Sequence, residues 1–304
     1  MTDTVYRRSL QVVALLFAAL MVAFVVSLIL QSRAAFQHFG LGFLVTQTWD
    51  PVHGHFGVLT FIVGTLASSA IAIVLAVPIG LGTAIFLVEF APRMIRAPLS
   101  ALVELLAAVP SVVYGLWGLL VVAPWVRVVL EPSLQKIPIL SAITRGPPLG
   151  IGLLLGGLIL AAMVLPTIAA VSRDVLAAVP AEQREAALAI GATRWQMVRR
   201  GMIPAVRTGI LGAVTLGLGR ALGETMAVTM VIGNDNVLPH SLLAPTQTIA
   251  SLIANEFAEA TEPYHLSSLV AAGVVLLVIC VIVNALARLL VWSVGRDRLQ
   301  VDVV

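Results

Sequence analysis

The stretch PAEQREAALAIGATRWQMVRRGMIP, residues 180–204, is polar and has two amphipathic helical pieces, and it lies between two long apolar stretches of the chain. Glu182 and Glu185 near its start suit the positive end of a helix dipole. Gly191 can adopt the left-handed backbone conformation that ends a helix. The stretch therefore predicts a helix, a turn at Gly191 and a second helix.

Trp195 and Met197 follow the predicted turn. A large aromatic side chain and a methionine on an otherwise polar loop are typical of a contact with another protein. An amphipathic helix that lies on a lipid surface has a similar composition. The pattern by itself is therefore compatible with either a protein contact or an interfacial helix.

The rest of the chain is too apolar for a soluble domain. Of its 304 residues, 60% are hydrophobic and only 11% are charged, and the mean hydropathy is +1.04. A soluble domain has about 25% charged residues. Stretches long enough to cross about 30 Å of hydrocarbon occur six times. We expect an all-α, polytopic membrane protein with one transmembrane domain over residues 1–304, a cytoplasmic loop at 173–207, and spans at about 12–30, 58–87, 105–123, 150–171, 208–232 and 266–287.

Basic residues predict the orientation of these spans. Six spans place both termini on the same side as loop 173–207, and most of the 18 lysine and arginine residues fall on that side. Because basic residues are retained in the cytoplasm, we expect both termini and this loop to be cytoplasmic. All five histidines then lie outside. His53 and His55 have no carboxylate cluster beside them, so we expect no metal site.

Lys136 is the only lysine, and Gln135 precedes it, so the chain has no G-x-x-x-x-G-K-[ST] phosphate loop. The single cysteine, Cys280, excludes an intramolecular disulfide. An intramembrane hydrolase would need a nucleophile and a base, but no histidine falls inside a predicted span. We therefore expect a transport subunit rather than an enzyme, with no cofactor in this chain, no nucleic-acid partner, and an energy source on another subunit or in a gradient.

Two charged residues interrupt the predicted fifth span, in LGLGRALGETMAVTMVIGN at 216–234. Arg220 and Glu224 are four positions apart, which on a continuous helix places them one turn apart on one face. Placing an Arg or Glu at the centre of a membrane span costs about 2.5 to 3.5 kcal/mol of insertion free energy. An exposed ion pair at this spacing stabilises a helix by only a few tenths of a kcal/mol. The pair is therefore a candidate substrate pathway in which Arg220 binds a tetrahedral oxyanion and Glu224 orients it. A structural bridge between subunits is the alternative.

Three hydroxyl groups are weaker pathway candidates. For Thr225 and Thr229, a hydrogen bond to the carbonyl four residues earlier is the favoured interpretation. Ser111 follows a proline that frees one backbone carbonyl, which this serine would satisfy unless it faces the passage. Tyr114 and Trp117 share a helix face with that proline, and packing is favoured over a gate because aromatic residues at helical spacing are usually core.

The loop at 180–204 resembles the E-A-A-x-x-x-G loop of bacterial ABC importer permeases. In that family the loop seats a short helix in a groove of a cytoplasmic ATPase, so the resemblance implies a type I ABC importer permease fold and an ATPase partner. Gly201 departs from the pattern, because a branched aliphatic residue is usual three places before the proline. The residues that the resemblance assigns to ATPase coupling are Glu185, Ala186, Ala187, Gly191 and Pro204.

Three further motifs resemble the phosphate-specific, PstC-type branch of these permeases: LGLGRALGETMAV in the fifth span, ELLAAVPSVVYGLWG at 104–118, and WDPV at 49–52 followed by FGVL at 56–59. The resemblance covers nearly the whole chain. It implies phosphate import across a bacterial inner membrane, with Arg220 and Glu224 on the path of phosphate. It also implies a second, PstA-like permease, two PstB-like ATPase subunits and a periplasmic or lipid-anchored PstS-like phosphate-binding protein. A permease for another oxyanion such as sulfate, or a subunit that senses the state of the transporter, remains the alternative.

Overall fold

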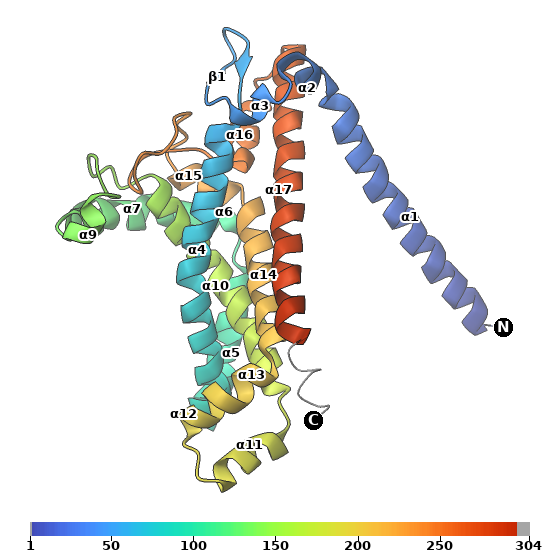
Figure 1. The fold of residues 1–304 in the computed structure, drawn as a ribbon, viewed down its shortest axis with the longest axis vertical. Helices are drawn as coiled ribbons and strands as arrows, with labels where there is room; N and C mark the ends of the chain where they lie inside the picture. Colours follow the sequence, from blue (N-terminus) through green and yellow to red (C-terminus); the bar gives the residue numbers. More distant parts are fainter. Residues whose placement is uncertain (1, 297–304) are drawn as a thin grey trace.

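The computed structural model describes residues 2–296, and this part of the chain is almost entirely helical (Figure 1). Its body is an elongated bundle of α4 (Leu59–Ile85), α10 (Leu153–Ala177), α14 (Arg207–Gly223) and α17 (Pro263–Arg296). Among the described residues, five helices are long and apolar enough to cross a membrane, or six if one bent pair counts as a span. The predicted all-α, polytopic fold class is confirmed.

Small residues explain how closely the central helices pack. A Cβ atom on Gly157 of α10 would lie 2.5 Å from the side chain of Ile71 on α4, and one on Gly217 of α14 would lie 2.8 Å from Ile168 on α10. Ala72 and Ala76 of α4 are fully buried in the same core. Close approach of backbones at small residues is the usual way in which helices associate in a membrane.

The N-terminal helix α1 (Thr2–Gln31) leans away from this bundle, and its apolar side chains from Tyr6 onward are mostly exposed (Figure 1). It is joined to α2 (Arg33–Phe39) at a break, where Ser267 of α17 bridges the two helices. The hydroxyl of Ser267 donates to the carbonyl of Gln31 at 2.8 Å and accepts from the backbone N–H of Ala35 at 3.1 Å. Ser267 thereby links the first two helices to the last helix.

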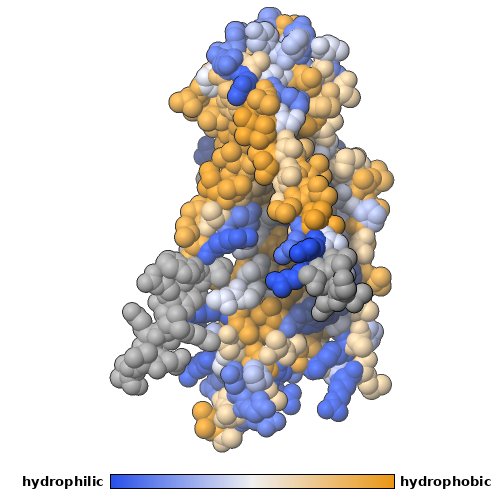
Figure 2. Space-filling model, turned by 90° about the vertical axis from the view of Figure 1, so that its right-hand side faces the viewer, coloured by the Kyte–Doolittle hydropathy of each residue, from blue (hydrophilic) through white to orange (hydrophobic). Residues whose placement is uncertain are grey.

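A short hairpin lies at the upper end of the molecule in Figure 1. After α3 (Gly42–Val45), strands β1 (Trp49–Asp50) and β2 (His55–Phe56) pair antiparallel. The indole N–H of Trp49 donates to Glu256 Oε2 at 2.7 Å, and His265 Nε2 lies 2.9 Å from the same oxygen. Glu256 ends α16 (Ile249–Glu256), so these contacts join the hairpin to α16 and α17. Figure 2 shows hydrophilic residues at this tip, a broad hydrophobic surface below it, and hydrophilic residues again toward the opposite end.

The third span differs from its predicted range of 105–123. Helix α5 (Arg93–Ala108) ends first, Val109 and Pro110 are extended with ψ of 130° and 141°, and a new helix begins with α6 (Ser111–Trp117). The proline causes this break, because it lacks an N–H and disfavours helical geometry in the residue before it. The membrane-length segment is therefore 111–135, which continues through η2 (Gly118–Val122), α7 (Ala123–Trp125), η3 (Val126–Leu130) and α8 (Glu131–Gln135), before α9 (Pro138–Ser141).

The fifth span is also not the continuous helix predicted over 208–232. Helix α14 ends at Gly223, Glu224 is extended with a ψ of 128°, and α15 (Met226–Val231) follows Thr225. On its other side α14 meets the loop helices at a bend of 75°. These are α11 (Ala181–Ala189), α12 (Arg194–Gln196), η4 (Met197–Met202) and α13 (Ile203–Ala205), and with η1 (Phe86–Phe90) they form the lower end of the molecule in Figure 1.

Candidate solute pathway and coupling loop

Arg220 and Glu224 lie on different segments and make different contacts. Arg220 is half-buried on α14, and its Nη1 donates to the hydroxyl of Thr167 on α10 at 3.2 Å. Glu224 Oε1 accepts from the backbone N–H of Ala227 at 3.3 Å, in the first turn of α15. No ion pair joins the two residues among the described side chains. The expected interaction between them is therefore absent among the described side chains, because Arg220 turns to α10 and Glu224, which caps α14 after Gly223, turns to the first turn of α15.

Arg220 is consequently a half-buried cation whose one hydrogen bond among the described residues goes to a neutral hydroxyl. A guanidinium group has five N–H donors, so most of those on Arg220 remain available to a ligand. Hydrogen bonds from arginine to an oxyanion are charge-assisted and about twice as strong as bonds between neutral groups. An arriving anion can therefore displace the contact with Thr167. Arg220 has the chemistry of an anion-binding residue.

The two broken spans lie against each other. A Cβ atom on Gly115 of α6 would lie 2.7 Å from Met230 Sδ and 3.1 Å from the Cα of Ala227, both on α15. Tyr114 Oη donates to the carbonyl of Leu106 at 2.9 Å and so bridges the break between α5 and α6. Irregular backbone at membrane depth is tolerated only where protein buries it or where it lines a cavity. The juxtaposed breaks mark this part of the bundle as a candidate pathway.

The three hydroxyl groups that were weaker pathway candidates differ in their hydrogen bonds. Thr229 Oγ1 donates to the carbonyl of Thr225 at 2.8 Å, which is the back-bond that the sequence favoured for it. Thr225 Oγ1 donates to the carbonyl of Gly223 at 3.4 Å, at the end of α14. Ser111 is half-buried at the first residue of α6, and its hydroxyl bonds to no other described residue. Ser111 is thus the hydroxyl that remains available to a solute.

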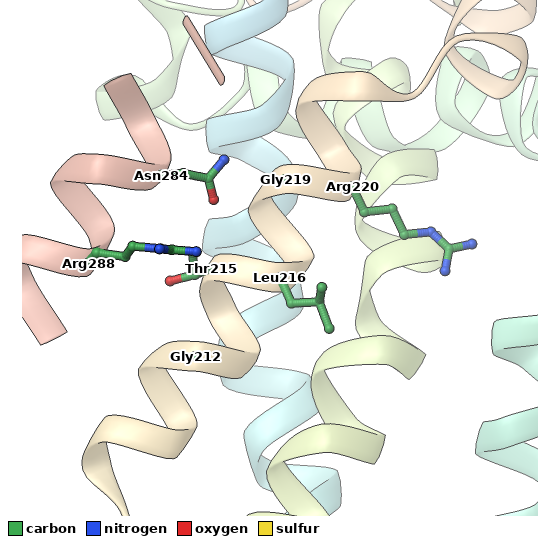
Figure 3. A pocket seen from close by; sticks show the side chains of 7 residues that line it. All are labelled: Gly212, Thr215, Leu216, Gly219, Arg220, Asn284 and Arg288. Carbon is green, nitrogen blue, oxygen red and sulfur yellow. The ribbon is translucent and has the colours of Figure 1, made fainter. Parts of the chain in front are cut away.

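A cavity of about 770 Å³ opens between α14 and α17 (Figure 3). Asn284 and Arg288 line it from α17 and Arg220 lines it from α14, although the guanidinium end of Arg220 extends away from α17 in Figure 3. The sequence interpretation missed Asn284, although a carboxamide inside an apolar span is a signal in itself. The space beside Gly219 is open, because the nearest atoms that a Cβ atom there would meet are those of the Asn284 carboxamide, at 4.0 Å. The remaining lining residues are Gly212, Thr215 and Leu216.

The loop folds as the predicted helix, turn and helix. Gly191 has a φ of 88°, which strains any residue with a side chain, and the hydroxyl of Thr193 accepts from the backbone N–H of Gln196 to begin α12. Among the residues assigned to coupling, Glu185 and Ala186 are exposed on α11, whereas Ala187 and Pro204 are half-buried. The outer face of α11 at Glu185 and Ala186 and the turn at Gly191 are therefore accessible to a partner.

Met197 is not presented beside Trp195, and this expectation was wrong. Trp195 is 55% exposed, but Met197 is 3% exposed and packs with Leu176, Val198 and Met202 in a core at the base of the bundle. An apolar side chain at this position gains more from that core than from solvent.

A contact that the sequence did not suggest holds α11 in place. Arg184 Nη1 lies 2.7 Å from Glu89 Oε1 on η1, which directly follows α4, and its Nη2 donates to the carbonyl of Leu176 at 2.9 Å. Arg184 is adjacent to Glu185, so the anchor fixes the inner face of α11 while Glu185 faces outward. The loop is attached to the spans by its own arginine.

Comparison with known proteins agrees with this geometry. Residues 76–296 match the family described as binding-protein-dependent transport system inner membrane component. The chain is 46% identical to the phosphate transport system permease protein PstC of Mesorhizobium japonicum over 298 residues, which cover 97% of this chain and 91% of the relative. It is 43% identical to the protein of that name from Pasteurella multocida over 300 residues, which cover 97% of this chain and 93% of the relative.

Two solved structures share the fold. One is the MetNI methionine ABC transporter in an inward-facing conformation, with a TM-score of 0.57 at 19% identity over 81% of this chain and 99% of that chain. The other is a bacterial alginate ABC transporter in complex with an alginate pentasaccharide-bound periplasmic protein, with a TM-score of 0.55 at 18% identity over 92% of this chain and 93% of that chain. This protein therefore belongs to the family of inner-membrane permease components of binding-protein-dependent ABC transporters and has the type I importer fold.

Proposed function

We propose that this chain is one of two permease subunits of an ATP-driven phosphate importer and that it forms half of the translocation pathway. The observation that carries the proposal is Arg220, a half-buried cation inside the bundle whose described contact is the neutral hydroxyl of Thr167. A charge inside a membrane span is expensive and marks a functional site by default. An arginine fork matches a tetrahedral oxyanion. The names of the curated relatives support phosphate as that anion.

Glu224 has a different task in this proposal from the one that its spacing indicated. Its carboxylate accepts from the N–H of Ala227 and so fixes the junction between α14 and α15. The junction determines where the chain leaves the helical path just after Arg220. Glu224 thus shapes the pathway, and Arg220 meets the anion.

The loop provides the connection to ATP hydrolysis. Glu185, Ala186 and Trp195 are exposed at one end of the molecule, where an ATPase groove would receive α11 and the turn at Gly191. The proposed complex contains a PstA-like permease, two PstB-like ATPases and a periplasmic or lipid-anchored PstS-like phosphate-binding protein at the opposite end. The proposed orientation puts both termini in the cytoplasm. The start of α1 and the end of α17 both lie toward the loop end in Figure 1, which supports it.

The test is uptake of radiolabelled phosphate by the complete transporter in proteoliposomes. Arg220→Gln keeps a polar side chain but removes the positive fork, and we expect it to lower phosphate uptake at least about tenfold, the equivalent of about 1.4 kcal/mol. Arg145→Gln, at an exposed arginine outside the bundle, is the matched control and should transport normally. Co-purification of all subunits establishes assembly of both variants.

Normal phosphate uptake by an assembled Arg220→Gln transporter would overturn the pathway role of Arg220. Uptake of radiolabelled sulfate in preference to phosphate by the unsubstituted complex would assign the chain to another oxyanion.

A further inference from the structure

A second cavity, of about 360 Å³, lies at the loop end of the molecule and is separate from the Arg220 region. Residues of η1, α5, α10 and α11 line it, and it is open to the surface. We call it the arginine cavity, because Arg96, Arg173 and Arg184 line it together with the hydroxyl-bearing residue Ser100. The other lining residues are apolar, so no carboxylate lines the cavity in the described part of the chain.

Donors in this cavity lack acceptors. Arg184 Nε is buried and has no hydrogen-bond partner, although both Nη atoms of this side chain are engaged by Glu89 and by backbone carbonyls. Arg96 is exposed, its Nη2 donates to the carbonyl of Val88 at 2.8 Å, and its other nitrogens have no acceptor among the described residues, so Arg184 Nε is the buried donor here that lacks a partner. A buried donor without a partner is costly, and a native structure usually supplies its acceptor as a ligand or an ion.

Two of the three arginines form ion pairs with carboxylates of residues that do not line the cavity. Arg173 Nη1 lies 3.0 Å from Glu104 Oε1, and its Nη2 lies 2.8 Å from Asp174 Oδ1. Arg184 is held by Glu89. Arg96 has carbonyl acceptors only, so its charge is not neutralised by an ion pair. The arrangement fixes guanidinium groups in place and leaves the charge of Arg96 at the cavity.

We propose that the arginine cavity binds a phosphate-type oxyanion, which is either free inorganic phosphate or the headgroup phosphate of an anionic lipid. Planar guanidinium forks match tetrahedral oxyanions, and a serine hydroxyl can donate one further bond. The site does not depend on the transport function proposed for Arg220. Because Arg184 belongs to α11 and Arg96 to α5, a bound anion connects the anchor of the loop to a second helix.

The experiment uses the full-length chain with Arg220→Gln as the background, so that the pathway arginine does not contribute to binding. Binding of radiolabelled inorganic phosphate is measured by equilibrium dialysis in lipid-free detergent. In parallel, native mass spectrometry measures the retention of phosphatidylglycerol against phosphatidylcholine. We expect Arg96→Gln to weaken binding of the anion at least about tenfold. Arg93→Gln, an exposed arginine one turn earlier on α5 that does not line the cavity, is the matched control and should bind like the background.

Phosphate binding that Arg96→Gln weakens identifies the free anion as the ligand, and selective retention of phosphatidylglycerol that the same substitution abolishes identifies the lipid headgroup. Ser100→Asp provides a second test if Arg96→Gln does not fold, because its carboxylate is surrounded by arginines and should exclude an anion while preserving the thermal unfolding midpoint. The proposal is overturned if neither ligand binds the background protein. It is also overturned if a folded Arg96→Gln or Ser100→Asp variant binds both ligands as the Arg93→Gln control does.

Discussion

Glu224 acts on the backbone of the residues that follow it, through the hydrogen bond from the N–H of Ala227. A glutamine oxygen can accept the same bond. We therefore expect Glu224→Gln to keep phosphate uptake within a few-fold of the unsubstituted complex, and Glu224→Ala to lower the free energy of unfolding by about 1 kcal/mol as the bond is lost. Uptake and detergent-phase thermal unfolding check this. A loss with Glu224→Gln as large as that with Arg220→Gln would contradict it, because the charge itself would then be required.

The residue types in the fifth span predicted buried charge correctly, but their spacing did not predict its partners. Arg220 is half-buried in the bundle, as a cation in an apolar span must be unless it reaches the membrane surface. The contact with Thr167 comes from another helix, 53 residues away in sequence, and no local pattern contains it. Glycine is about 1 kcal/mol less favourable than alanine in a helix, but Gly217 and Gly219 lie inside α14 without breaking it, so Gly223 alone did not predict the break.

Tyr114 holds α5 and α6 together across their break through its bond to the carbonyl of Leu106. Tyr114→Phe removes this bond and leaves the carbonyl without that donor. We expect the free energy of unfolding to fall by about 0.5 to 1.5 kcal/mol, measured by thermal unfolding in detergent. Tyr6→Phe, at an exposed tyrosine on α1, is the control and should not shift the unfolding midpoint. Equal midpoints for the two variants would show that the bridge contributes nothing to stability.

Glu185 lies on the outer face of α11, away from the anchor at Arg184. Glu185→Lys reverses a charge at the exposed face without disturbing a described contact, so we expect the chain to fold normally and to retain less of the ATPase during co-purification. Glu182→Lys, also exposed on α11, tests whether any charge reversal on this helix has that effect. Full retention of the ATPase together with normal uptake in Glu185→Lys would refute the docking role.

The ends of helices were predictable from the sequence where a single residue type decides them. The turn at Gly191 followed from glycine at a helix end, and the structure has it at a φ of 88°. The start of the third span was misplaced at 105, because hydropathy continues smoothly across Val109 and Pro110 while the backbone does not. A proline in an apolar run can kink a helix or end it, and only tertiary packing decides which.

The whole chain lacks the machinery to hydrolyse ATP. Its only lysine, Lys136, lies outside any phosphate loop, so the purified chain should show no ATP turnover above that of a mock preparation. Activity should appear when the partner ATPase is added. Turnover that co-elutes with this chain after removal of every ATPase subunit would contradict this prediction.

For the whole molecule, the apolar content of the sequence predicted the class of protein, but it did not predict the arrangement of the helices. The number of spans follows from hydropathy, since each must cross the bilayer. The outward lean of α1 does not follow from it, because a helix that is apolar on all sides has no preferred face to bury.

The bridge at Ser267 has a consequence for how the chain is made. Its hydroxyl fixes Gln31 and Ala35, which a ribosome completes more than two hundred residues before it reaches Ser267. The junction between α1 and α2 therefore lacks these two hydrogen bonds during nearly the whole of synthesis. The hydrogen bond that holds the hairpin also forms late, because the acceptor of the Trp49 N–H is Glu256, which is synthesised about two hundred residues after it. A nascent chain arrested before Glu256 therefore lacks both hydrogen-bonded links, and one arrested between α16 and α17 still lacks the bridge at Ser267, which forms only when the last helix is made.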